Sequence, residues 1–98
     1  MPLALKDSSL LKEQCFVEGR WIGEGATDVT DPATGAVLGR VPKFGAAETT
    51  EAVDAASRAF KSWAATTAKQ RALILRRWFE LIIESRDDLG LILTSEQG

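Results

Sequence analysis

Glycine and proline are distributed so unevenly along this 98-residue chain that they divide it in two. Residues 13–45 hold six of the eight glycines and two of the three prolines, whereas residues 46–96 hold no proline and one glycine, Gly90. Because both residue types interrupt regular structure and mark turns, we expect short strands and turns in the first part and helices in the second. The sequence therefore predicts an α+β unit in which N-terminal β-hairpins precede three helices.

The first turn signal is Glu18-Gly19, which separates two short runs of aromatic and β-branched residues, 15–17 and 20–22. A two-residue loop that contains glycine favours a tight hairpin. Gly23-Glu24-Gly25 then interrupts the pattern. We interpret it as a plain connecting loop, because neither the further glycines of a dinucleotide-binding loop nor a Walker lysine follows.

The second turn signal combines Pro32, which presets the backbone for a turn, with Gly35, which accepts a positive φ. Asp28 and Asp31 lie three residues apart, and paired carboxylates can bind a metal ion. Further oxygen ligands at the spacing of a calcium loop are missing, so we expect Asp31 to cap the turn instead. Pro42 has no amide hydrogen to donate, which predicts that the second hairpin ends there.

Three helical segments are predicted in residues 46–98. Gly45 can cap the first, in which apolar residues recur at steps of three and four: Val53, Ala56, Phe60 and Trp63. Thr67 and Gln70 have the spacing of a capping box, which begins the second. Residues 85–88 (Ser-Arg-Asp-Asp) are expected to cap a third, short helix that closes at Gly98.

The second of these helices is apolar around more than half of its circumference, more than a lone surface helix needs. We interpret the surplus as surface that faces protein outside these 98 residues. Trp21, Trp63 and Trp78 could suggest a ligand platform, but Trp63 and Trp78 lie on the apolar stripes. Core packing is therefore the better interpretation for these two side chains.

Charge and composition exclude several classes of function. Twelve basic and fourteen acidic residues give a net charge of −2, which disfavours a nucleic-acid binder. The chain has no histidine, so it lacks histidine-based general bases, the usual zinc ligand sets and any Ser-His-Asp triad. We interpret two charged groups as solvated helix faces, one basic and one acidic: Lys69, Arg71, Arg76 and Arg77; Glu84, Asp87, Asp88 and Glu96.

The single cysteine, Cys15, rules out an internal disulfide and fits a reducing compartment. It lies in a predicted strand with no histidine to activate its thiol, so we expect a buried structural side chain. Residues 1–12 lack the features of a signal or transit peptide. No apolar run approaches the roughly 18 residues that span a bilayer. The expected location is the cytoplasm, without a membrane partner.

Several segments resemble the N-terminal region of the aldehyde dehydrogenase family. Residues 17–21 (Val-Glu-Gly-Arg-Trp) are similar to its first hairpin. Residues 31–39 (Asp-Pro-Ala-Thr-Gly-Ala-Val-Leu-Gly) closely resemble the family's Asn-Pro-Ala-Thr-Gly-Glu-Val-Ile-Gly stretch, with Asp in place of the commoner Asn. Residues 55–63, with Arg71 and Leu75, resemble the first helix pair, and Glu96-Gln97-Gly98 resembles the family's Glu-x-Gly. Within the family, residues 3–16 and 67–81 are most similar to succinate-semialdehyde dehydrogenases.

The resemblance implies that residues 1–98 are the N-terminal part of a cofactor-binding domain, with strands and turns in 1–45 and helices in 46–98. When intact, the protein would have the α/β fold of the family and act as a cytoplasmic homo-oligomer. It would oxidise succinate semialdehyde to succinate with NAD or NADP. A cysteine thiolate would attack the aldehyde, hydride would pass to the nicotinamide, and water would hydrolyse the thioester.

In the family, the nucleophilic Cys, the Glu base, the oxyanion Asn and the cofactor-binding residues all come later in the chain. The resemblance therefore implies no catalytic, cofactor-binding or metal-binding residue within 1–98, and Cys15 does not correspond to the nucleophile. Some members bind a monovalent cation partly through backbone carbonyls near Val29 and Thr30, but the other ligands lie elsewhere and we assign no metal site. The 98 residues alone are predicted to be inactive, to bind no cofactor, and to pack against the remainder of the same subunit.

A second hypothesis of a different class stays open: a free-standing helical interaction module without catalysis, with a partner for the Trp78 face. The residues leave open the choice of NAD or NADP, the aldehyde, the oligomeric state, and whether Gly98 is a natural terminus or a truncation.

Overall fold

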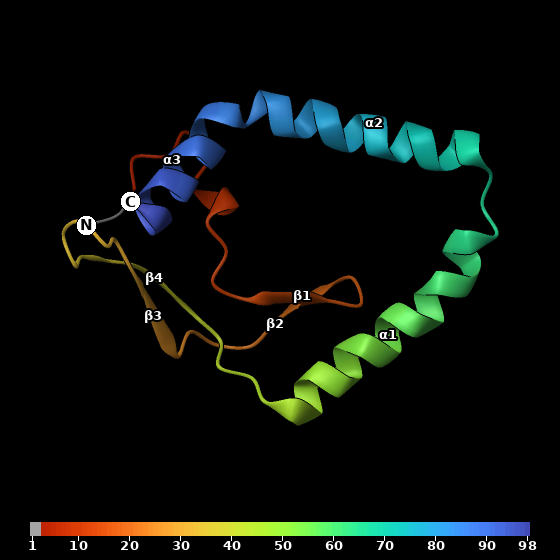
Figure 1. Ribbon diagram of the computed structural model, residues 1–98, viewed down its shortest axis with the longest axis horizontal. Helices are drawn as coiled ribbons and strands as arrows, with labels where there is room; N and C mark the ends of the chain where they lie inside the picture. The colour runs from red at the N-terminus through yellow and green to blue at the C-terminus, as the bar shows by residue number, and fades with distance from the viewer. Residues whose placement is uncertain (1–2) are drawn as a thin grey trace. The chain divides into compact units, whose positions relative to one another are not determined.

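The computed structural model describes residues 3–98, which belong to two compact units. One unit contains the chain up to Lys43 together with Arg86–Gly98, and the other is Phe44–Ser85 (Figure 1). The first holds a short 3-10 helix, η1 (Ser8–Leu10), four strands and helix α3 (Arg86–Gln97). The second holds helices α1 (Ala46–Ala64) and α2 (Ala68–Glu84). The predicted order of hairpins followed by three helices is confirmed.

The first hairpin joins β1 (Cys15–Val17) to β2 (Arg20–Ile22) in a two-stranded antiparallel sheet. Phe16 lies opposite Trp21 in its register. Glu18 and Gly19, with φ of 52° and 75°, are both left-handed, as a two-residue type I′ turn requires. This backbone demand explains the glycine at position 19.

The second hairpin joins β3 (Thr27–Thr30) to β4 (Val37–Val41) in a separate two-stranded antiparallel sheet. In the turn, the Asp31 carboxylate accepts a hydrogen bond from the Ala33 amide at 2.8 Å, and Gly35 has a φ of 76°. The Gly35 amide donates to the Asp31 carbonyl at 2.7 Å. The predicted capping by Asp31, the positive φ at Gly35 and the end of the strand before Pro42 are all confirmed.

Helices α1 and α2 begin at the predicted caps. The Glu48 carboxylate accepts from the Gly45 amide at 3.2 Å ahead of α1. Ahead of α2, the Thr67 hydroxyl accepts from the Gln70 amide at 3.1 Å, and the Gln70 side chain accepts from the Thr67 amide at 2.9 Å. These reciprocal bonds satisfy amides that have no partner inside a helix.

Helix α3 differs from expectation at its start. The Ser85 amide donates to the carbonyls of Leu81 and Ile82 and so closes α2, and the Asp88 carboxylate binds a distant segment of the chain. Ser85 and Asp88 therefore have roles other than the predicted capping of α3. At the far end, the Gly98 amide donates to the Thr94 carbonyl at 2.9 Å with a φ of 75°, which confirms Gly98 as the closing residue.

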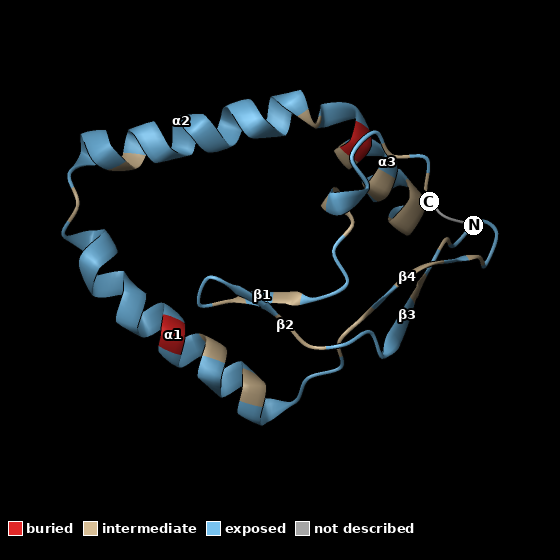
Figure 2. Ribbon diagram, turned by 180° about the vertical axis from the view of Figure 1, so that it is seen from behind, coloured by how far each residue is buried: buried red, intermediate tan, exposed pale blue. Residues whose placement is uncertain are grey.

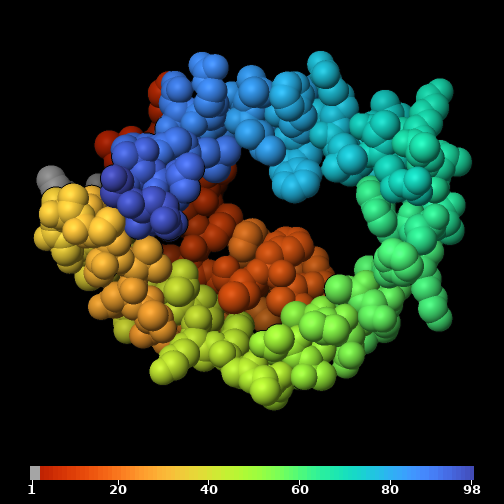
Figure 3. All heavy atoms as spheres, viewed as in Figure 1, coloured from red at the N-terminus to blue at the C-terminus, as the bar shows by residue number. Residues whose placement is uncertain are grey.

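Burial is sparse in the described residues (Figure 2). Ala55 in α1, 8% exposed, is the one buried hydrophobic residue among them, and Asp88 in α3, 7% exposed, is the one buried charged residue. Helix α2 exposes eight large apolar side chains: Leu73, Ile74, Leu75, Trp78, Phe79, Leu81, Ile82 and Ile83. Figure 3 draws the side chains of α2 as spheres, in the teal to blue part of its colour range.

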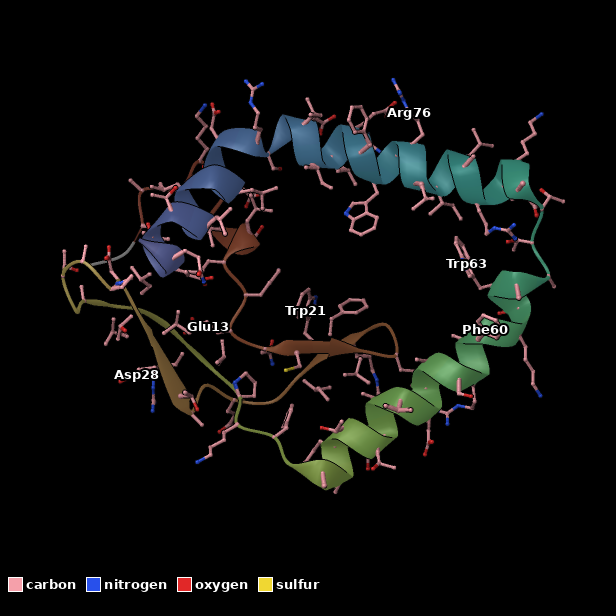
Figure 4. The ribbon with its side chains drawn as sticks, in the orientation of Figure 1. Glu13, Trp21, Asp28, Phe60, Trp63 and Arg76 are labelled. Atoms are coloured by element: carbon pink, nitrogen blue, oxygen red, sulfur yellow. The ribbon has the colours of Figure 1, made fainter. Side chains whose placement is uncertain are left out.

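Core packing of Trp63 and Trp78 is not found in residues 3–98. Trp63 is 40% exposed and Trp78 is 62% exposed, so their apolar stripes exist but have no opposing surface here. Phe60 and Trp63 project from the C-terminal part of α1 (Figure 4). The periodicity located these stripes correctly, while the packing that we expected from it is absent.

We predict that Thr67→Ala lowers the thermal midpoint of the purified protein, because the Gln70 amide loses its acceptor. Loss of an N-cap hydroxyl costs about 0.5–2 kcal/mol of stability. Thr67→Ser is the matched control, since it keeps the hydroxyl and should keep the midpoint. Equal midpoints for the Ala and Ser variants would contradict the capping role.

We also predict that the 98-residue chain, produced alone, binds a hydrophobic dye and aggregates, since its large apolar side chains are exposed. Changing Leu75 and Ile82 together to Ser should reduce dye fluorescence, while Arg76→Ser on the charged face should not. A sharp cooperative melt without dye binding would show that the apolar surface is covered by the chain itself.

Candidate functional site

Cys15 is the first residue of β1 and lies opposite Ile22. Its side chain is half-buried, not fully buried as expected, because a two-stranded ribbon gives it only partial cover. It forms no disulfide. Among residues 3–98, no three His, Cys, Asp or Glu side chains gather where they could hold a metal ion.

Arg40 on β4 organises the loop and strand where Asp28 lies. Its guanidinium donates to the Asp28 carboxylate at 2.8 Å and to the Ala26 carbonyl at 3.0 Å. Its backbone amide donates to the Glu13 carboxylate at 2.8 Å. Asp28 is thus paired with Arg40, while Asp31 caps its own turn, so the two carboxylates do not act together. Figure 4 labels Glu13 and Asp28 in this unit.

The loop at Gly23-Glu24-Gly25 is shaped by the same arginine. A Cβ atom at Gly25 would come within 2.8 Å of the Arg40 Cβ, so the loop requires glycine for a close approach to β4. The glycine therefore has a packing role, which confirms the interpretation of a connecting loop.

The acidic residues near α3 have different surroundings. Glu84 forms an ion pair with Arg77 at 3.7 Å and Asp87 is well exposed, as expected for a solvated face. Glu96 is half-buried. Asp88 contradicts the solvated-face interpretation: it is buried, and its two carboxylate oxygens accept from the Lys6 and Asp7 amides, both at 2.9 Å. Nothing in the sequence separates Asp88 from Asp87, because the partner lies more than 80 residues away.

Asp7, one of these two donors, also fixes η1. Its carboxylate accepts from the Ser9 hydroxyl at 2.5 Å and from the Ser9 amide at 3.0 Å. These two hydrogen bonds favour the ionised form and lower the pKa of Asp7 below its ordinary value. The residue is a cap, and its geometry offers no proton-transfer partner beyond Ser9.

The basic residues of α2 form a solvated face, as predicted for Arg76 and Arg77. Arg76 pairs with Glu80 at 3.5 Å, and Arg77 pairs with Glu80 at 3.6 Å. Exposed pairs of this kind contribute little to stability. Arg71 is the exception, since its guanidinium is partly buried and donates to the Thr66 carbonyl at 2.5 Å. That bond holds the turn between α1 and α2, a role the sequence reasoning missed.

The three tryptophans lie on different elements, β2, α1 and α2. Trp21 packs edge-on against Phe16 with ring centroids 4.9 Å apart, and the Lys12 ammonium lies 4.8 Å from its ring centre. This is a cross-strand aromatic pair with a cation above it. Val29 and Thr30 lie at the end of β3, where the strand register shifts.

No described helix combines the length and the apolar character that crossing a bilayer requires. The arrangement in residues 3–98 consists of turns, caps and ion pairs that fix local structure. Within each unit, the contacts given for the candidate side chains belong to such turns, caps and ion pairs.

Comparison with known proteins gives a consistent result. The model of the aldehyde dehydrogenase family matches residues 21–98. A 3-sulfolactaldehyde dehydrogenase of Pseudomonas putida is 52% identical over 99 aligned residues, which cover 98% of this chain and 20% of that protein. A succinate-semialdehyde dehydrogenase of Escherichia coli strain K12, whose name specifies NADP(+), is 52% identical over 100, with the same two coverages.

A solved structure agrees with these relatives. The crystal structure of an aldehyde dehydrogenase from Brucella melitensis biovar abortus 2308 superposes with a TM-score of 0.94 at 56% identity, covering 98% of this chain and 20% of that one. The chain thus spans about a fifth of the length of the proteins it matches. Since the family model matches well over half of its residues, the chain belongs to the aldehyde dehydrogenase family.

Proposed function

We propose that residues 1–98 are a structural part of the cofactor-binding domain of an NAD(P)-dependent aldehyde dehydrogenase, with strands in 1–45 and helices in 46–98. The exposed apolar surface of α2 carries this proposal. Eight large apolar side chains on one helix would be costly in water, and a larger protein of this family offers the surface to cover them. The partner of α2 is then the remainder of the same subunit.

For the whole protein, we propose oxidation of succinate semialdehyde to succinate. Two relatives of equal identity are named for succinate semialdehyde and for 3-sulfolactaldehyde. Both compounds carry an aldehyde at one end and an acid group at the other, so the shared substrate class is an anionic aldehyde. The resemblance of residues 3–16 and 67–81 to succinate-semialdehyde dehydrogenases favours the carboxylate.

The glycine-containing loop at 23–25 does not have the form of a phosphate-binding loop for a nicotinamide cofactor. The glycine-containing loop at 23–25 is occupied by its close approach to Arg40, and no phosphate-binding spacing follows it. The cofactor, which supplies the hydride acceptor in aldehyde oxidation, would therefore be bound by other residues of the whole protein. Within this proposal the protein is a cytoplasmic homo-oligomer and residues 1–98 carry no catalytic role.

The mass of the protein in its source cells tests the first proposal. Trypsin releases residues 78–86 (Trp-Phe-Glu-Leu-Ile-Ile-Glu-Ser-Arg), and this peptide identifies the protein in a sized gel band. Given 20% coverage of the relatives, we expect roughly five times the 10.6 kDa of these 98 residues. A mass near 10.6 kDa would instead favour the free-standing interaction module, which the exposed α2 surface also fits.

The substrate is tested by the rise in NAD(P)H absorbance with the purified protein from those cells. We expect turnover with succinate semialdehyde, weaker turnover with 3-sulfolactaldehyde and least with butanal, which lacks an acid group. Preference for butanal would contradict the proposed class of anionic aldehydes. Preference for 3-sulfolactaldehyde would keep the class and replace the substrate.

We predict that Cys15→Ser leaves turnover by the whole enzyme unchanged. Cys15 is half-buried in a hairpin, opposite Ile22, and it has no place in the proposed chemistry. Turnover number and the far-ultraviolet circular dichroism spectrum should both match the parent protein. Lost turnover with an unchanged spectrum would place Cys15 in the reaction.

A further inference from the structure

Asp88 is the one buried charged residue in 3–98, and its side chain accepts hydrogen bonds from residues far away in the sequence. It is the third residue of α3 and is 7% exposed. Its Oδ1 accepts from the Lys6 amide and its Oδ2 from the Asp7 amide, both at 2.9 Å, across 82 and 81 residues of sequence. A carboxylate that accepts from two consecutive amides forms charge-assisted hydrogen bonds, the stronger class.

This use of Asp88 differs from the ordinary one. An aspartate in the first turn of a helix usually faces solvent, where it interacts with the helix dipole or the free amides of that turn. Asp87, the neighbouring carboxylate, behaves in this way: it is well exposed, and it lies 3.9 Å from the Lys6 ammonium. The two adjacent aspartates therefore have different roles. Only Asp88 accepts hydrogen bonds from the backbone amides of Lys6 and Asp7.

The N-terminal segment that Asp88 binds comprises residues 3–11. Its four leucines, Leu3, Leu5, Leu10 and Leu11, are half-buried, so apolar burial holds it only in part. Asp7 contributes twice, because its backbone amide donates to Asp88 while its carboxylate caps η1 through Ser9. The 3-10 turn and the attachment to α3 therefore meet at one residue.

We propose that residues 3–11 form a strap that is latched onto the first turn of α3 by the Asp88 carboxylate. Opening the latch releases the strap from α3 while the two hairpins and α3 stay folded. The hairpins support this independence, since their turns are held by their own residues, Gly19 and Asp31 among them. The strap and α3 lie in the same compact unit.

The test compares Asp88→Asn with Asp87→Asn in the whole protein by hydrogen–deuterium exchange and mass spectrometry. Asparagine keeps the size of the side chain but turns one acceptor oxygen into an NH₂ group that faces an amide donor. We expect exchange within residues 5–8 to rise about tenfold in Asp88→Asn, the loss of roughly one charge-assisted bond. Exchange in residues 15–41 should stay at the parent level, and Asp87→Asn should change neither region.

Two results would overturn the proposal. One is equal exchange of the strap in the two variants. The other is faster exchange of the hairpins together with the strap in Asp88→Asn, which would make Asp88 a general support of the unit. If Asp88→Asn does not fold, amide exchange in the parent protein tests the proposal instead. Slow exchange of the Lys6 and Asp7 amides relative to a peptide of residues 3–12 supports the latch, and equal exchange refutes it.

Discussion

Hydrogen bonds between near neighbours define most of the turns and helix ends of this structure, in which almost no apolar side chain is buried. Ala55 is the one buried hydrophobic residue in 3–98, so the two hairpins, α1 and α2 rely on their own turns or caps. The Glu18-Gly19 turn forms one hairpin, and the Thr67–Gln70 box begins α2. Such bonds define local conformation, but most of the stability of helices and sheets comes from packing. The backbone conformation of these elements is therefore well defined, while their large apolar side chains are exposed.

Helix α2 carries the largest group of exposed apolar side chains in residues 3–98. Arg76, Glu80 and Glu84 form its charged face. Leu75, Phe79 and Ile82 form one apolar row, and Ile74, Trp78 and Leu81, each one position earlier, form a second row about 100° around the helix. Together the two rows make one wide apolar face, which is exposed in residues 3–98. An exposed apolar face of this size is typical of a surface that contacts other protein.

The features predicted from sequence are those that depend on a few adjacent residues. Gly19 and Gly35 lie in turns that need a positive φ, and Thr67 caps the helix that it precedes. In each case the residues that form the pattern also form the predicted turn or cap. Asp88 and Arg40 could not be assigned in this way, because their partners at Lys6 and Glu13 lie 82 and 27 residues away. The same limit explains Trp78: periodicity defines an apolar row, but the surface that covers it depends on residues distant in sequence.

The stretch with the closest resemblance to a family motif, residues 31–39, is built around a turn. The stretch from Asp31 to Gly39 contains a capped turn and the start of β4, and the positive φ at Gly35 favours glycine there. Two relatives that share 52% identity with this segment are named for different aldehydes. Function resides in sites built onto a fold, whereas the hydrogen bonds at Asp31 and Thr67 fix local conformation. Similarity in these turns and caps therefore identifies the family.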